Sequence, residues 1–343
     1  MVNRNRARSA VLAATAAVLV LSLGSCSDDQ NEDSARIPVA EPGKVAAFAL
    51  GELSTTYDLD HTAVNESGHI TSDKAGNIYL ASDSNSPLMP ILRMTPEGKV
   101  SQFTKIKESH SDSGFTAAPD GSLVTGGGDG LWRVSSKGTV TSLESQRRFK
   151  LPNPIGIRPD GTVVVIDGES VWSLKDGQAA ELLTFPANQG RVRGAVAPDG
   201  TIYLSNSRLD NLRVLAPGSP PRTLTIQGDL PGAGKPLSEM AIMQMTPATD
   251  GGVYAKVQWD PQKGGGGFVY IVHIAPSGTL TAMARASEQG KSCAAGEQYA
   301  ALDNPCVMPW FLARSGDQVL ALGDIYDPER KPSPALAIHA PRG

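Results

Sequence analysis

The sequence contains few of the residues from which a metal or redox centre is built. Its 343 residues include three cysteines and five histidines, and none of them form a Cys-x-x-Cys or His-x-x-x-His pair. Zinc sites and thiol redox motifs depend on such spacing, so neither is predicted. The Gly-x-Ser-x-Gly motif of α/β-hydrolases is also absent. The glycine-rich segments 126–130 and 264–267 do not lie between a strand and a helix, so neither is a phosphate-binding loop.

Long apolar runs are missing as well, apart from one near the start. Residues 10–23 are apolar or small, and they follow arginines at positions 4, 6 and 8. The run is too short for the roughly 20 apolar residues of a membrane span, but its length and basic flank are typical of a signal peptide. We therefore expect residues 1–25 to be a signal segment that is removed.

The end of this segment, Leu23-Gly24-Ser25-Cys26, resembles a lipobox. The resemblance implies a bacterial lipoprotein in which Cys26 is the lipidated first residue of the mature chain. More than one acyl chain, such as palmitate, would then hold the protein firmly at the cell membrane, facing outside the cytoplasm. The alternative is an ordinary cleaved signal in which Cys26 is incidental.

Residues 26–40 are polar and acidic, and they are predicted to form a flexible tether between the lipid and a folded domain. The formal net charge is −4, and removal of the three signal arginines leaves the mature chain near −7. This acidity argues against nucleic acid, and against anionic lipid, as an electrostatic partner. Two cysteines remain, Cys293 and Cys306, and outside the cytoplasm we expect them to form a disulfide.

One phrase recurs along residues 41–343: a short apolar strand, a turn rich in Asp and Gly, and a second apolar strand. Asp-Gly supplies the positive φ that a tight turn between twisted strands requires. The turn glycines are separated by 45, 40, 39, 51 and 65 residues, and they stand at positions 76, 121, 161, 200, 251 and 316. Intervals near 40 fit one four-stranded blade, so the fold class predicted is an all-β, six-bladed β-propeller.

The sixth copy of the phrase lacks a fourth strand, and the missing strand is found at the other end of the domain. Residues 41–48 read Glu-Pro-Gly-Lys-Val-Ala-Ala-Phe and resemble residues 96–103, Pro-Glu-Gly-Lys-Val-Ser-Gln-Phe. We expect this N-terminal strand to complete the last blade and close the ring, which removes an open sheet edge.

Two copies are similar to the NHL repeat, namely residues 76–94 and 200–214. Residues 153–161, Asn-Pro-Ile-Gly-Ile-Arg-Pro-Asp-Gly, resemble the corresponding segment of gluconolactonase-like propellers of the SMP-30 type. The resemblance implies the propeller architecture over residues 41–343. It implies no single function, because this fold is shared by lactonases, lyases and binding domains.

Propellers place their sites where the innermost strands begin, at the mouth of a central channel. Five candidate residues fall near these positions: His69, Asn153, Arg193, Glu239 and Trp310. Resemblance to the gluconolactonase-like enzymes implies that Asn153 could ligate a divalent cation, with Glu239 the one acid in a comparable position. A hard cation needs more oxygen ligands than these two, so no cofactor is predicted with certainty. The competing interpretation is that Asn153 bonds to local backbone.

The remaining polar residues favour structural roles. His273 and His339 fall on predicted third strands, away from the channel. Acidic and amide residues follow the second strands at Asp83, Asn85, Asp167, Glu169, Asp210, Asp260, Asp324 and Asp327. This acidic bias on one face could attract a cation or a cationic partner, but acidic residues in loops are more commonly just solvated. Two functions stay open: a non-catalytic module that binds a protein, glycan or cell-wall component, and a divalent-metal-dependent lactonase or lyase.

Overall fold

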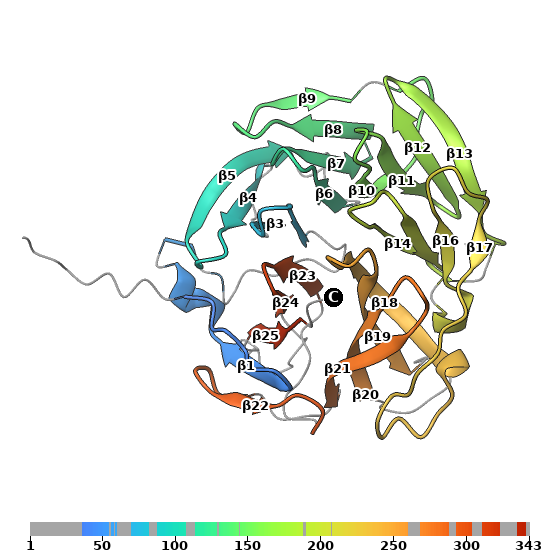
Figure 1. The fold of residues 1–343 in the computed structure, drawn as a ribbon. Helices are drawn as coiled ribbons and strands as arrows, with labels where there is room; N and C mark the ends of the chain where they lie inside the picture. The colour runs from blue at the N-terminus through green and yellow to red at the C-terminus, as the bar shows by residue number, and fades with distance from the viewer. Residues whose placement is uncertain are drawn as a thin grey trace, which may run out of the picture. The chain divides into compact units, whose positions relative to one another are not determined.

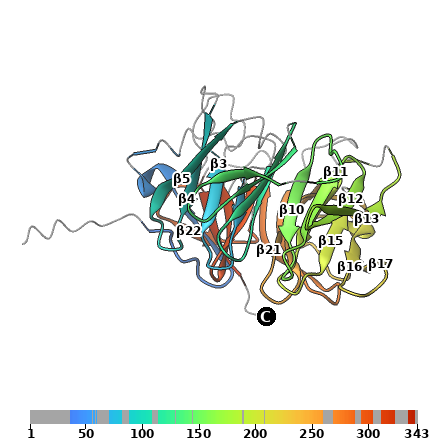
Figure 2. The same cartoon turned by 90° about the horizontal axis from the view of Figure 1, so that it is seen from above.

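The structure is a computed structural model. It describes residues 36–54, 56–57, 59, 70–81, 88–107, 114–128, 130–143, 145–187, 190–206, 208–259, 268–287, 293–303, 311–322 and 335–340. These residues form six antiparallel sheets arranged as the blades of a β-propeller, which confirms the predicted fold class. Figure 1 looks onto the ring of blades, and Figure 2 shows it from the side.

Five blades have four strands each, in chain order from the axis outward. Blades 1 to 3 consist of β2 (Ile70–Ser72), β3 (Ile78–Ala81), β4 (Leu88–Met94) and β5 (Val100–Lys107); β6 (Gly114–Ala117), β7 (Leu123–Gly127), β8 (Gly130–Val134) and β9 (Val140–Ser142); β10 (Asn153–Ile157), β11 (Val163–Asp167), β12 (Ser170–Lys175) and β13 (Gln178–Thr184). Blades 4 and 5 consist of β14 (Arg193–Val196), β15 (Ile202–Ser205), β16 (Arg213–Leu215) and β17 (Arg222–Thr223); β18 (Met240–Pro247), β19 (Val253–Trp259), β20 (Phe268–Ile274) and β21 (Leu280–Ser287).

The sixth blade joins the two ends of the domain, as the sequence predicts. Its strands are β23 (Phe311–Ser315), β24 (Gln318–Leu322), β25 (Ala335–His339) and, from the start of the domain, β1 (Lys44–Phe48). β1 pairs antiparallel with β25, with Val45 opposite Ile338. The sequence did not predict a fifth strand, β22 (Gln298–Ala300), which pairs with the outer side of β1.

The second strand of each blade is a nearly continuous apolar run because both of its faces are buried between blades. On β11, Val163 and Val165 pack toward blade 2, whereas Val164 and Ile166 pack toward blade 4. Within the described ranges the buried apolar residues fall into six clusters, and each cluster lies between two neighbouring blades. The core is therefore distributed around the ring, one part for each interface.

The innermost strands contact their neighbours in a closed cycle: β2, β6, β10, β14, β18 and β23. Side chains that bond to the backbone of the next strand connect four of these pairs: Thr71 Oγ1 with Ala117 N, Ser72 Oγ with Arg314 N, Gln244 with Leu312 N and O, and Arg193 Nε with Ile242 O. Between β10 and β14 the contact is closer still. A Cβ on Gly156 would lie 2.4 Å from Val196 Cβ, so only glycine fits there.

The hairpin turns that recur in the sequence lie together at one end of the propeller, which we call the turn face. At Gly121 the φ angle is +75°, which L-residues with a side chain rarely adopt. Four turn aspartates, at positions 120, 160, 199 and 250, accept a hydrogen bond from the backbone N–H two residues later. These bonds fix each turn, and with it the spacing between the first two strands of the blade.

The folded domain begins earlier than the predicted boundary at residue 41. Ile37 and Ala40 are buried against blades 1 and 6, and Ala40 N donates a 2.8 Å hydrogen bond to Gln318 Oε1. Residues 37–40, which the sequence assigned to the acidic tether, are therefore part of the folded domain. The rest of the tether stays a prediction. The signal segment and Cys26 lie outside the described residues. None of the helices in the described ranges is long and apolar enough to span a membrane.

Candidate functional site

The end opposite the turn face, where the innermost strands begin, is the strand-start face. Asn153 is the first residue of β10 and Arg193 is the first residue of β14. Glu239 ends the short helix η4 (Leu237–Glu239), directly before β18. His69 and Trp310 fall just before β2 and β23 in the chain, but both lie outside the described residues. The starts of three innermost strands thus bring one amide, one guanidinium and one carboxylate to this face.

Arg193 extends from β14 toward blade 5. Its Nε donates a 3.2 Å hydrogen bond to Ile242 O on β18, so the side chain connects two innermost strands. Burial, followed by the nearby charge of Arg191, lowers the pKa of Arg193 to about 10. The side chain still carries its positive charge at neutral pH. Among the described residues, no carboxylate forms a salt bridge with it.

Asn153 lies opposite Ile166, and that residue belongs to the core between blades 3 and 4. Within the described part of the chain its side-chain amide has no hydrogen-bond partner, so the local backbone bond favoured by the sequence is not found. The amide therefore keeps its donors and acceptor for another group.

Glu239 is half-buried, but it belongs to blade 5, whereas Asn153 belongs to blade 3. The innermost strand β14 lies between their strands, so the two predicted cation ligands do not start on neighbouring strands. In the described ranges no group of three or more His, Cys, Asp or Glu side chains is close enough together to hold a metal ion.

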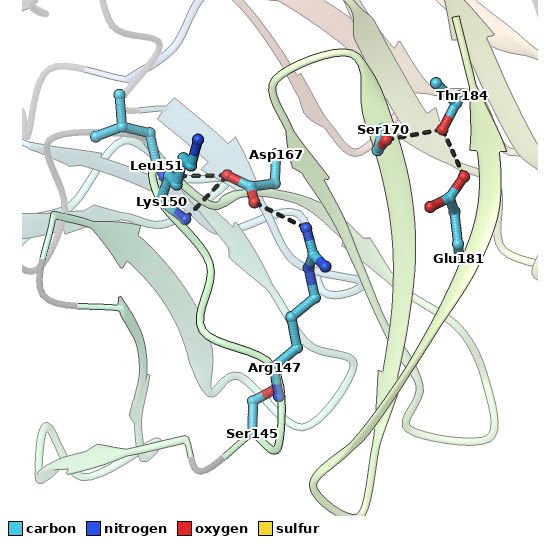
Figure 3. Close-up of polar contacts among 8 residues, drawn as sticks. All are labelled: Ser145, Arg147, Lys150, Leu151, Asp167, Ser170, Glu181 and Thr184. Atoms are coloured by element: carbon cyan, nitrogen blue, oxygen red, sulfur yellow. Dashed lines mark hydrogen bonds and ion pairs between the residues drawn. The ribbon is translucent and has the colours of Figure 1, made fainter.

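A loop from blade 2 to blade 3, residues 145–152, is held in place by Asp167 at the end of β11 (Figure 3). Asp167 Oδ1 accepts hydrogen bonds from the backbone N of Lys150 at 3.1 Å and of Leu151 at 3.0 Å. Its Oδ2 lies 3.7 Å from the guanidinium of Arg147, and only 6% of the Asp167 side chain is exposed. The sequence placed Asp167 among solvated acidic loop residues, whereas the structure shows a buried carboxylate that orders a neighbouring loop.

Arg147 is fixed from its other side by aromatic rings. Its guanidinium carbon lies 3.7 Å from the ring centroid of Trp172 and 5.6 Å from that of Phe149, within the range of cation–π attraction. The loop nevertheless leaves the side chain of Leu151 60% exposed. No sequence motif marks this arrangement. The one signal was a basic segment, residues 147–150, directly before a predicted innermost strand.

The strand-start face is also bounded by ordered side chains at blades 4 and 5. Arg208 forms two hydrogen bonds with Asp210 and donates a third, of 2.8 Å, to Ser238 O, which connects η3 (Leu209–Asn211) to η4. Lys235 Nζ lies 4.2 Å from the ring centroid of Trp259 at the end of β19. Asp210, like Asp167, is therefore paired with arginine rather than free to bind a cation.

Basic residues outnumber acidic ones over blades 3 and 4 of this face. Arg147, Arg148, Lys150, Arg191 and Arg193 lie on the connections that lead into β10 and β14. Against them, the turn after β11 contributes Asp167 and Glu169. The chain as a whole has a negative net charge, so this face is locally positive on an acidic protein.

Two histidines lie where the sequence placed them. His273 is on β20 and His339 is on β25, the third strands of blades 5 and 6. His273 Nε2 lies 3.0 Å from Asp250 Oδ2, next to the turn of blade 5. This pair belongs to the turn face and is remote from the strand starts.

Cys293 is buried in the core between blades 5 and 6. Its predicted disulfide partner, Cys306, lies outside the described residues. The disulfide stays a prediction.

Comparison with known proteins confirms the fold. No family model matches the sequence, and no curated protein is similar to it in sequence. A gluconolactonase from Xanthomonas campestris is similar in structure, with a TM-score of 0.52 and 12% identity over 89% of this chain and 100% of that one. An auxiliary nutrient binding protein from Bacteroides thetaiotaomicron has a TM-score of 0.55 and 13% identity over 86% and 76% of the two chains.

A member of the DUF4221 family from Bacteroides vulgatus is also similar, with a TM-score of 0.55 and 10% identity over 88% of this chain and 96% of that one. Identities this low show a shared propeller fold and nothing about the chemistry of the site. The resemblance to NHL repeats stays a prediction.

Proposed function

We propose that the chain is a membrane-anchored extracytoplasmic lipoprotein whose propeller binds a protein, glycan or cell-wall partner through the strand-start face. The sequence supports the location through the signal segment and Cys26. A propeller with loops of unequal length at one end suits a binding or scaffold role. Similar folds include both a nutrient-binding protein and a gluconolactonase, so the fold is compatible with binding without requiring catalysis.

The observation that carries the proposal is the ordered loop 145–152. Asp167 and Arg147 hold its backbone, while Leu151 points an apolar side chain into solvent. A loop that is already ordered loses little conformational entropy on binding, so its contacts contribute more of their free energy to affinity. An apolar side chain exposed on such a loop can be buried against a partner, and that burial would contribute to affinity.

The test compares Leu151→Asp with Val39→Asp. Val39 is 74% exposed but lies beside the turn face, near Gln298, so it controls for loss of an exposed apolar residue. Detergent-purified full chain is sedimented with isolated cell envelopes, with protease-treated envelopes and with purified cell-wall polymer. We expect Leu151→Asp to weaken binding by about tenfold or more, while Val39→Asp binds as the parent does. Equal binding by all three proteins would contradict the proposal.

The lactonase or lyase alternative depends on a divalent cation at Asn153. Calorimetric titration of the full chain with Ca²⁺ and other divalent ions tests it directly. Binding that is lost in Asn153→Ala would favour the enzyme, whereas no binding in the parent would remove its proposed cofactor.

A further inference from the structure

We infer that Arg193 forms an anion-binding subsite of the strand-start face, which takes a carboxylate or phosphate group of the partner. The inference deepens the proposed function and rests on it, since it names the chemistry that this face recognises. Arg193 stands at the start of an innermost strand, the part of each blade nearest the propeller axis.

The protein sets the position of the guanidinium, while no carboxylate among the described residues neutralises its charge. The Nε–H is used in the bond to Ile242 O, and this bond fixes the plane of the guanidinium. The two terminal nitrogens then have no carboxylate partner among the described residues. An arginine oriented in this way presents a planar fork of N–H donors, which matches the two oxygens of a carboxylate or phosphate.

Burying such a charge is unfavourable without a counter-charge. Proteins usually compensate a desolvated guanidinium with an acidic side chain. Arg193 instead has a like charge nearby, Arg191, and its pKa is lowered first by burial and then by that charge. A bound anion would supply the missing counter-charge, and it would be attracted further by the excess of basic residues on this face.

A second donor is present on the neighbouring innermost strand. Asn153 begins β10, which contacts β14, and its amide has no hydrogen-bond partner within the described residues. Arg193 extends toward blade 5, so this amide marks the opposite side of the β14 start, where it can donate to a further oxygen or a hydroxyl of a ligand that spans both strands. A sugar acid or sugar phosphate carries both kinds of group, and we take this class as the probe.

The experiment measures binding of glucuronate, glucose 6-phosphate, inorganic phosphate and glucose to detergent-purified full chain by calorimetry. The variants are Arg193→Gln, Arg193→Lys and Arg158→Gln. Arg158 is the matched control, because it is also a half-buried arginine on an innermost blade segment whose Nε bonds to a backbone carbonyl, Gly200 O at 3.1 Å, but at the turn face. Circular dichroism melts check that each variant folds.

We expect the parent and Arg158→Gln to bind the anions and not glucose, with affinity that falls as salt is raised. Arg193→Gln should weaken anion binding by about tenfold or more, and Arg193→Lys, which keeps the charge but loses the fork, should lie between. Preference for glucuronate and glucose 6-phosphate over inorganic phosphate would support a sugar-linked anion, and equal affinity would support the phosphate or carboxylate group alone.

The inference is overturned if the anions bind no better than glucose, or if Arg193→Gln binds them as the parent does. That result leaves the proposed function standing where Leu151→Asp still loses envelope binding. The opposite result is also distinguishable. Anion binding that is lost in Arg193→Gln would support the subsite, while envelope binding that is unchanged in Leu151→Asp would contradict the proposed function.

Discussion

Val45 of the first strand lies opposite Ile338 of the last, and this pairing closes the ring. Deletion of residues 41–50 removes β1, and with it Phe48 from the core between blades 6 and 1. We expect the deletion to destabilise the whole domain by about 4 kcal/mol or more, since loss of one buried Phe side chain alone costs about 3–5 kcal/mol. Thermal melts of the full chain with and without these residues measure the change. If both proteins melt alike, the ring closes in another way.

Gly156 tests the close contact between blades 3 and 4. Its φ angle is not in the positive range, so Gly156→Ala strains no backbone turn and acts through the clash with Val196. Overpacking of this kind costs about 1–3 kcal/mol. Gly161→Ala is the contrast, because Gly161 has φ of +83° and no atom within 4 Å, so its cost of about 1 kcal/mol comes from the backbone. Denaturant unfolding of both variants, each alone and combined with Val196→Gly, separates the causes: glycine removes both the Cβ and the Cγ2 that clash, so it should offset the cost of Gly156→Ala and not that of Gly161→Ala.

Asp167→Ala should loosen the loop 145–152 and leave the blades intact. The substitution removes the acceptor for two backbone N–H groups and the partner of Arg147, a local loss of about 1–3 kcal/mol. Hydrogen exchange followed by mass spectrometry should show faster exchange in residues 145–152. Asp160→Ala, which removes an aspartate that bonds to Thr162 N and Lys175 on the turn face, should leave that exchange unchanged.

Two buried tyrosines should limit stability at alkaline pH. Burial, followed by the charge of Asp73, raises the pKa of Tyr79 to about 12, and burial followed by Asp199 and Asp250 does the same for Tyr203. The pKa of each phenol is therefore higher in the folded protein than in the unfolded chain, where it is 10.0, so the fold stabilises the neutral form. Their stabilisation is complete below about pH 10 and is lost as the pH rises toward about 12. Denaturant unfolding as a function of pH, with tyrosinate absorbance, measures it. The double Phe variant should lose less stability over this range, and an equal loss would assign it to other groups.

Cys26→Ser should release the protein, still folded, from the membrane into the surrounding medium. Acyl chains on Cys26 are the sole anchor that the sequence predicts, since no second apolar run approaches the length of a span. Cell fractionation and a melting curve of the released protein check both parts. Cys293→Ser is the control: it should stay with the membrane, and its stability should fall by about 3 kcal/mol if Cys293 and Cys306 form the predicted disulfide.

The blades were predictable because the strands and turns of each blade are specified by residues close together in the sequence. The Asp-Gly turns and the apolar strands beside them repeat, and even β1 could be assigned because residues 41–48 resemble residues 96–103. β22 could not be, because Gln298–Ala300 is short, is partly exposed and has no apolar alternation. These residues form a strand because they pair with the otherwise open edge of β1.

For the candidate site, the sequence predicted where two of its residues lie in the fold and not which groups they contact. Asn153 and Arg193 could be placed because they begin innermost strands. The pairing of Asp167 with Arg147 joins the end of one strand to a loop from the preceding blade, and the bond of Arg193 to Ile242 O depends on how blade 5 packs beside blade 4. Contacts between blades are not encoded in any one repeat, so they emerge only when the ring is assembled.

The pairing of β1 with β25 also sets an order of events while the chain is synthesised. β1 is among the first parts of the domain to emerge, yet its partner is among the last, so β1 has no sheet to join until nearly the whole chain has arrived. Contacts this distant along the chain make folding slow. Blades 1 to 5 can form from local hairpins, whereas the sixth blade cannot be completed until β25 has been synthesised. A chain interrupted shortly before Ala335 would therefore hold five assembled blades and an open ring with two exposed edges, a form suited to aggregation or to proteolysis.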